Sequence, residues 1–178
     1  MRSLRIFGMA LLALTNQALG QQQSPYVEYQ GRSIMALSAE QIGSYLAGDG
    51  MGFALAAELN GYPGPRHVLE LADSLSLDVV QQERVQAAFD SMRGRAQVLG
   101  AAVVDQEQIL DSLFAARTIT KERLESILAE LAELQGQLRA VHLAAHVSLV
   151  GVLSQHQVRE YQRLRGYSAG QHRHQRNP

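Results

Sequence analysis

Two histidines, His142 and His146, stand four residues apart in a stretch that is otherwise mostly apolar or small. Residues four apart lie on one face of an α-helix, so both imidazoles can bind a single metal ion. At about 100° per residue, His142 shares the azimuth of Leu124, and His146 shares that of Leu128. We therefore expect both rings at the flank of the apolar stripe of a helix. There they either bind metal or pack against a neighbouring helix.

Two protein ligands do not make a tight metal site, so further donors are needed. Glu58 and His67 are weaker candidates, and an acidic residue from a second copy of the chain is another. His67 precedes an apolar run and also fits a purely structural role. His172 and His174 lie near the C-terminus, where short histidine-containing tails are commonly solvated. Imidazoles suit Zn, Ni, Co or Cu, and we expect no organic cofactor.

The composition excludes several other kinds of chemistry. The chain has no cysteine, so it contains neither disulfides nor thiolate ligands. No serine–histidine–aspartate, cysteine–histidine or paired-carboxylate arrangement stands out, and we do not expect an enzyme. Without residues 1–20, 14 basic and 17 acidic residues leave a net charge of −3. This charge argues against a nucleic-acid partner.

The N-terminus has the pattern of an export signal. Arg2 and Arg5 precede an apolar core over residues 6–14, and small residues at Ala18 and Gly20 fit a cleavage site. The core is too short to span a bilayer. We therefore expect a signal peptide over residues 1–20, cleavage near Gly20 and a periplasmic protein. An uncleaved membrane anchor is the alternative.

The rest of the chain predicts an all-α fold, because aromatic residues are few and helix-forming residues dominate. A heptad pattern predicts one helix from Val79 to about Ala115, with the seam Val85, Phe89, Met92, Ala96, Leu99, Val103, Gln106, Leu110 and Leu113. A second helix follows Thr120, with the stripe Leu124, Leu128, Leu131, Leu138, Ala145 and Leu149. The short link between them predicts a long antiparallel hairpin.

Shorter elements flank this hairpin. We expect a loose leader over residues 21–37 and an N-terminal helical segment over residues 38–64, which starts at a capping box of Ser38 and Gln41. The hairpin domain spans residues 65–167, and a disordered polar tail spans residues 168–178. A single hairpin leaves apolar edges uncovered, which favours a homodimer.

Two five-residue stretches resemble each other and flank the hairpin. Each consists of a leucine, a capping residue, two variable residues and a glutamine: Leu77, Asp78 and Gln81 in the first, and Leu153, Ser154 and Gln157 in the second. Asp and Ser side chains accept hydrogen bonds from free N–H groups of the first turn, and the glutamine reaches back to the cap. Taken singly, each stretch is simply the start of a helix.

As a pair in an exported, cysteine-free chain, these stretches resemble the Leu-Thr-x-x-Gln repeat of the Spy/CpxP family of periplasmic stress proteins. That group includes heavy-metal-resistance proteins of the CnrX and ZraP type. The resemblance covers about residues 65–167, and Asp78 and Ser154 replace the threonine of the signature. It implies an all-α dimeric hairpin that acts as an ATP-independent chaperone or as a metal sensor or buffer. In the CnrX-like branch, a late-helix pair of histidine and methionine contributes metal ligands.

Three functions follow from these patterns. The flank placement of the two histidines favours a periplasmic metal-binding sensor or buffer. An ATP-independent chaperone or stress adaptor, which would bind unfolded clients or a membrane-bound envelope-stress regulator, is the first alternative. A structural helical protein that docks on a partner is the second.

Overall fold

The computed structural model describes residues 24–167, and their fold is all-α. The elements within this range are η1 (Val27–Gly31), α1 (Ala39–Ala47), α2 (Leu55–Glu58), α3 (Pro65–Glu70), α4 (Val79–Ala115), α5 (Lys121–Ser148) and α6 (Gln155–Leu164). The predicted signal peptide and the predicted polar tail lie outside the described residues.

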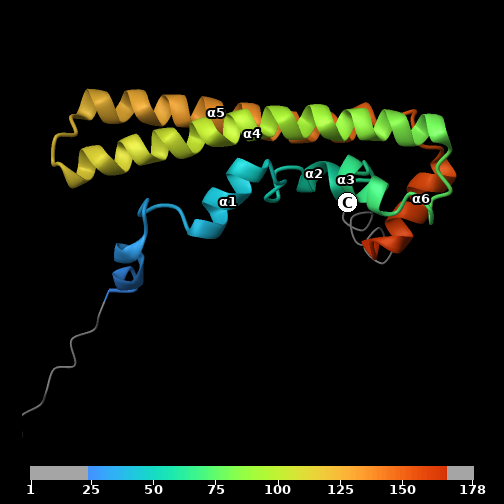
Figure 1. Ribbon diagram of the computed structural model, residues 1–178, viewed down its shortest axis with the longest axis horizontal. Coiled ribbons are helices and arrows are strands. Elements are labelled where there is room, and N and C mark those ends of the chain that lie inside the picture. The colour runs from blue at the N-terminus through green and yellow to red at the C-terminus, as the bar shows by residue number, and fades with distance from the viewer. Residues whose placement is uncertain (1–23, 168–178) are drawn as a thin grey trace, which may run out of the picture.

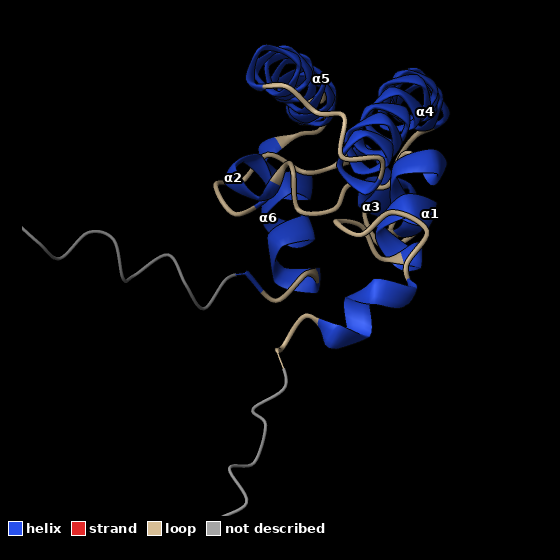
Figure 2. Ribbon diagram, turned by 90° about the vertical axis from the view of Figure 1, so that its left-hand side faces the viewer, coloured by secondary structure: helices blue, strands red, loops and turns tan. Residues whose placement is uncertain are grey.

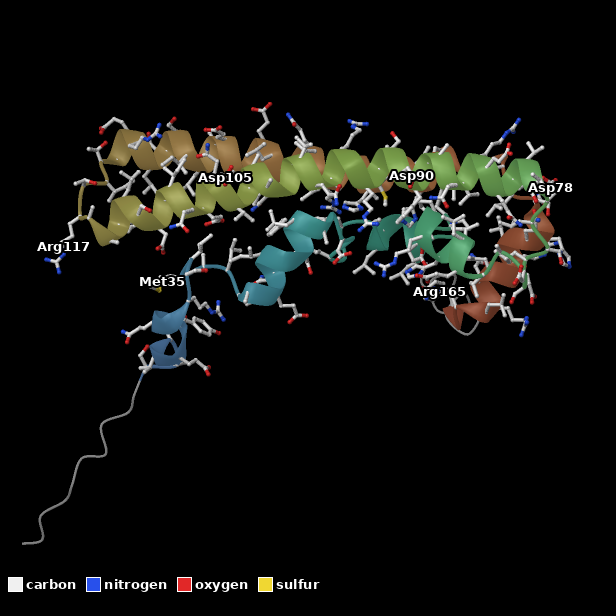
Figure 3. The ribbon with its side chains drawn as sticks, in the orientation of Figure 1. Met35, Asp78, Asp90, Asp105, Arg117 and Arg165 are labelled. Atoms are coloured by element: carbon white, nitrogen blue, oxygen red, sulfur yellow. The ribbon has the colours of Figure 1, made fainter. Side chains whose placement is uncertain are left out.

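The long hairpin is formed by α4 and α5, which pack against each other along their lengths (Figure 1). The predicted bounds of α4 are confirmed, because Asp78 caps its first turn and the chain turns after Ala116. Thr120 caps α5 by accepting a hydrogen bond from the Arg123 N–H, as predicted. Asp78 and Arg117 therefore mark opposite ends of a long, narrow molecule (Figure 3).

A second layer of short helices lies along one side of the hairpin (Figure 2). The predicted capping box of Ser38 and Gln41 starts α1, which packs on α4, and Gly48 ends α1 in a left-handed conformation. After the glycine-rich loop, α2 packs on α5, and α3 starts at Pro65 and packs on α4. The N-terminal segment thus covers one face of the hairpin.

The segment before α1 differs from the loose leader that the sequence predicted. Ile34 and Leu37 are buried in the core and join in an isolated bridge. The Met35 N–H donates to Asp111 Oδ1 of α4 at 3.1 Å. Two buried apolar side chains and a long-range hydrogen bond hold this stretch in place, although it lacks a helical period.

The predicted apolar stripes of α4 and α5 are buried or half-buried, with one exception on α5. Val85, Ala96 and Val103 are completely buried on the predicted seam of α4. On α5, Leu128 is 48% exposed and Ile127 is buried in its place. His146 shares the azimuth of Leu128 but is buried. The difference arises because α2 packs on α5 and does not extend to the turn end of the hairpin, where Leu128 lies (Figure 1).

Both predicted capping boxes of the repeated motif are present, and their glutamines meet. Gln81 Nε2 donates to Gln157 Oε1 at 3.0 Å, and Gln157 Nε2 donates to Gln81 Oε1 at 2.9 Å. The second N–H of each amide donates to a backbone carbonyl, that of Val152 for Gln81 and that of Leu75 for Gln157. The two motifs therefore join the start of α4 to the start of α6.

Two apolar clusters form the core. One lies along the hairpin under α1 and contains Ile34, Leu37, Tyr45, Ala96, Val103, Ile127, Leu131, Leu138 and Val141. The other lies at the open end with α3 and α6 and contains Val68, Leu75, Leu77, Val85, Leu149, Leu153 and Tyr161. On α5, His142 and His146 fall between these two clusters.

No helix within residues 24–167 is both long enough and apolar enough to cross a membrane.

Candidate metal site

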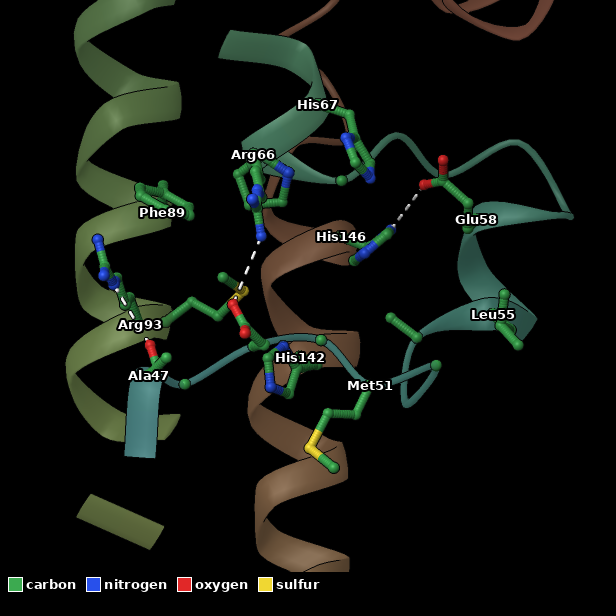
Figure 4. Close-up of a pocket in the computed structure, with 18 of the residues that line it drawn as sticks. Ala47, Met51, Leu55, Glu58, Arg66, His67, Phe89, Arg93, His142 and His146 are labelled. Atoms are coloured by element: carbon green, nitrogen blue, oxygen red, sulfur yellow. Dashed lines mark hydrogen bonds and ion pairs between the residues drawn. The ribbon is translucent and has the colours of Figure 1, made fainter. Parts of the chain in front are cut away.

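A pocket of about 500 Å³ opens between the two layers of helices. Its walls come from the glycine-rich loop after α1, from α2, from the start of α3, from the middle of α4 and from the end of α5. Both predicted histidines line it, as do Glu58 and His67 (Figure 4). The structure therefore brings all four sequence-predicted candidates of the described chain to one cavity.

His146 is held in one tautomer by the loop between α2 and α3. Its Nδ1 lies 2.7 Å from the Tyr62 carbonyl oxygen, which only accepts, so Nδ1 carries the proton. In the neutral ring, Nε2 is then the nitrogen with a free lone pair. Gly64 leaves this edge uncovered: a Cβ there would lie 2.9 Å from Nε2 and 3.5 Å from Glu58 Oε2.

Glu58 is the most constrained side chain of the pocket. Its Oε1 accepts hydrogen bonds from the hydroxyls of Tyr161 at 2.6 Å and Tyr167 at 3.0 Å, and Arg165 Nε lies 3.5 Å away. Its Oε2 is buried without a hydrogen-bond partner and lies 3.7 Å from His146 Nδ1 (Figure 4). The carboxylate is thus fixed through one oxygen, which leaves the other oxygen available.

His142 is 2% exposed, which is more buried than the flank position predicted from the sequence. The ring stacks on Phe53, and its Nε2 is buried without a hydrogen-bond partner. Burial lowers the pKa of His142, and nearby His146 lowers it further, while Asp49 acts in the opposite direction. The neutral imidazole is therefore favoured, which is the form that binds metal.

His67 plays a different part. Its Nδ1 lies 2.7 Å from Glu70 Oε2 on the same helix, and its side chain is about one-third exposed. This hydrogen bond is the main cause of the lowered pKa of Glu70. His67 therefore has a local partner already, whereas Glu58 and the two α5 histidines hold donor atoms that face the cavity.

The donor atoms are not gathered into a finished coordination sphere. Across residues 24–167, no three histidine, aspartate or glutamate side chains converge closely enough to hold a metal ion. The fit to a metal rests on the chemistry of the donors: two imidazoles one turn apart and a carboxylate on the facing loop. Binding would require these side chains to draw together.

Sequence reasoning missed the residues that orient these donors. Tyr161 and Tyr167 fix Glu58, and the Tyr62 carbonyl fixes His146. These partners lie 84 to 109 residues apart in sequence, so no local spacing pattern reveals them. Tyr161, which lies on α6 with the apolar residues Val158 and Leu164, was the one available signal.

Comparison with protein-family models, with curated proteins and with solved structures found no significant match to this chain. The resemblance to the Spy/CpxP family therefore stays a prediction that depends on the paired capping motif.

Proposed function

We propose that this protein binds a divalent transition-metal ion in the pocket, with His142, His146 and Glu58 as its ligands. The observation that supports this most is that His142 Nε2 and Glu58 Oε2 are both buried without hydrogen-bond partners on the walls of one cavity. Leaving such groups unpaired costs free energy, which a bound cation would recover. Zn, Ni, Co and Cu all accept imidazole ligands.

The neighbours of the ligands support the same proposal. Histidines that bind metal commonly donate their other ring N–H to a carbonyl or a carboxylate, and His146 donates to Tyr62 in this way. Metal-binding carboxylates are commonly fixed by further hydrogen bonds, as Glu58 is by Tyr161. The pocket thus has outer-shell contacts of the kind that orient ligands.

The biological role that fits is a periplasmic sensor or buffer. Glu58 links the pocket to Tyr161 on α6 and to Tyr167 just beyond it. A metal ion that draws Glu58 inward would disturb these contacts and change the position of α6, which a partner could detect. Export and homodimerisation belong to this proposal as predictions from the sequence.

Isothermal titration with Zn²⁺ and with Ni²⁺ tests the proposal. All proteins carry His172→Ala and His174→Ala, so that the C-terminal tail contributes no imidazole. We expect one site per chain in this parent protein, and a loss of affinity of at least about tenfold in His142→Ala/His146→Ala. Equal binding by the parent and the double variant would exclude this pair as ligands.

A glycine pair gives a matched control. Gly64→Ala places a methyl group against His146 Nε2 and near Glu58 Oε2, whereas Gly50→Ala, in the glycine-rich loop that also lines the pocket, meets no atom within 4 Å. We expect Gly64→Ala to weaken metal binding and Gly50→Ala to leave it unchanged. Circular dichroism of both variants verifies that they are folded.

A chaperone function is the second candidate, and one surface favours it. Leu55, Leu59 and Tyr62 are each at least 40% exposed on and after α2. Exposed apolar residues grouped in this way are typical of surfaces that bind unfolded segments. If equimolar protein fails to reduce the aggregation of a chemically unfolded client, this alternative is wrong.

A further inference from the structure

Two methionines line the same pocket as the histidines. Met51 belongs to the glycine-rich loop after α1, and Met92 lies on α4, on the opposite wall. The described part of the chain holds one other methionine, Met35, which lies away from the pocket toward the turn end of the hairpin (Figure 3). Two of the three described methionines thus face one cavity together with His142.

The backbone at Met51 is unusual. Met51 has a φ of 42°, in the left-handed region that a residue with a Cβ rarely adopts. Such strain commonly marks positions where the direction of a side chain matters. Figure 4 shows the Met51 side chain extending from the loop toward α5. The loop therefore presents a thioether where a glycine would be less strained.

The walls around these residues combine aromatic and charged side chains. Phe53 stacks on His142, and Phe89 lines the pocket from α4 near Met92. His142 Nε2 is buried and has no hydrogen-bond partner. Asp49, Arg66 and Arg93 also line the pocket, and Met51 is 38% exposed. The softness of the set therefore comes from its donor atoms, which are two thioethers and one neutral imidazole. Soft sulfur ligands select Cu(I) over the divalent ions.

We propose that the pocket is a cuprous-ion site in which Met51, Met92 and His142 are the ligands. This rests on the proposed function because it uses the same pocket and one of the same imidazoles, but it names a different ion and two additional ligands. The His146 imidazole, a borderline ligand, and the Glu58 carboxylate, a hard ligand, are not part of this Cu(I) site. The two thioethers themselves favour the lower oxidation state of copper.

The first test is an anaerobic competition titration with Cu(I) and a chromophoric Cu(I) chelator. Met51→Leu and Met92→Leu conserve volume and keep the pocket apolar, so both variants are expected to fold. We expect each to weaken Cu(I) binding by at least about tenfold and to leave the Zn²⁺ affinity unchanged. Met35→Leu is the matched control and should match the wild type for both ions.

The second test follows the methionine methyl groups by NMR during addition of Ag⁺, a diamagnetic substitute for Cu(I). The methyl signals of Met51 and Met92 should shift together at one equivalent, whereas that of Met35 should not. Cu(I) affinity that is equal in Met51→Leu, Met92→Leu and Met35→Leu would overturn the inference, as would a failure of the wild type to bind Cu(I). Neither result depends on the Zn²⁺ titration, which tests the proposed function separately. The failure of this inference and that of the proposed function are therefore distinguishable.

Discussion

His142 combines deep burial with a titratable ring. Its folded-state pKa lies below the ordinary value near 6.5, mainly because burial disfavours the charged imidazolium and also because His146 is close. The unfolded chain therefore takes up a proton at His142 at higher pH than the folded chain does. The stability that depends on the neutral ring is complete above about pH 6.5 and is lost as the pH falls through the folded pKa.

We predict that the free energy of unfolding falls more steeply between pH 8 and pH 5 in the wild type than in His142→Gln. Glutamine keeps a polar side chain but does not titrate, so the difference between the two slopes isolates His142. Urea unfolding at several pH values, with a chelator present, measures both slopes. Parallel pH profiles for the two proteins would contradict the burial of a neutral ring.

The candidate site could be predicted only in part from the sequence. The four-residue spacing of His142 and His146 identified both imidazoles, because spacing within one helix is a local property. Glu58 was only a weaker candidate ligand in the sequence. Its position in the site depends on the loop that brings it next to α5 and on its hydrogen bond with Tyr161, 103 residues away. The full burial of His142 was also missed, because it depends on the loop that brings Phe53 over the ring.

At the scale of elements, the two glutamines of the repeated motif cap their helices and also connect the two helix starts. Each amide accepts from the N–H of its own cap and also exchanges hydrogen bonds with the other amide. All four N–H groups of the Gln81 and Gln157 amides are thus used. Each motif alone predicted a helix start, but nothing in either stretch indicated that the two starts contact each other.

We predict that Gln81→Ala and Gln157→Ala each destabilise the protein by about 2 kcal/mol, since each removes several partly buried hydrogen bonds worth about 1 kcal/mol apiece. The double variant should cost less than the sum, with a coupling energy of about 1 kcal/mol. Urea unfolding gives all three values. Gln86→Ala, on the exposed face of α4, is the control and should change stability by less than about 0.5 kcal/mol. Strict additivity would show that the amide pair is not formed.

The contact between α1 and α4 depends on one glycine. A Cβ on Gly100 would overlap the carbonyl oxygen of Tyr45, whereas a Cβ on Gly94 meets no atom within 4 Å. Both glycines lie inside α4, which runs through the two positions without a break. Gly100 lets the backbone of α1 approach closely.

We predict opposite effects of alanine at these two positions of one helix. Gly94→Ala should stabilise the protein by up to about 1 kcal/mol through helix propensity. Gly100→Ala should destabilise it by about 1 to 3 kcal/mol, because α1 must shift away from α4. Thermal unfolding of both variants decides the matter. A Gly100→Ala protein as stable as Gly94→Ala would mean that α1 does not pack as described.

At the scale of the whole molecule, the helix bounds could be predicted well and the arrangement of the layers could not. Capping boxes are local signals, and they predicted the starts of α1, α4 and α6. The packing of residues 34–67 along the hairpin depends on contacts between distant residues, which no short pattern encodes. Homodimerisation also stays a prediction.

The pocket lies where the two apolar clusters of the core meet, and this position explains its polar lining. The hairpin seam is interrupted there by His142 and His146, while apolar residues on either side hold the helices in place. The central claim is therefore that a rigid hairpin presents two imidazole Nε2 atoms to one ion.

The most direct measurement is a histidine-ring ¹H–¹⁵N NMR spectrum of the full chain, recorded before and after one equivalent of Zn²⁺. We predict that the Nε2 resonances of His142 and His146 shift, whereas His146 Nδ1 keeps the signature of a protonated nitrogen bound to Tyr62. If only His172, His174 or His67 responds while the two α5 rings are unchanged, the account is wrong.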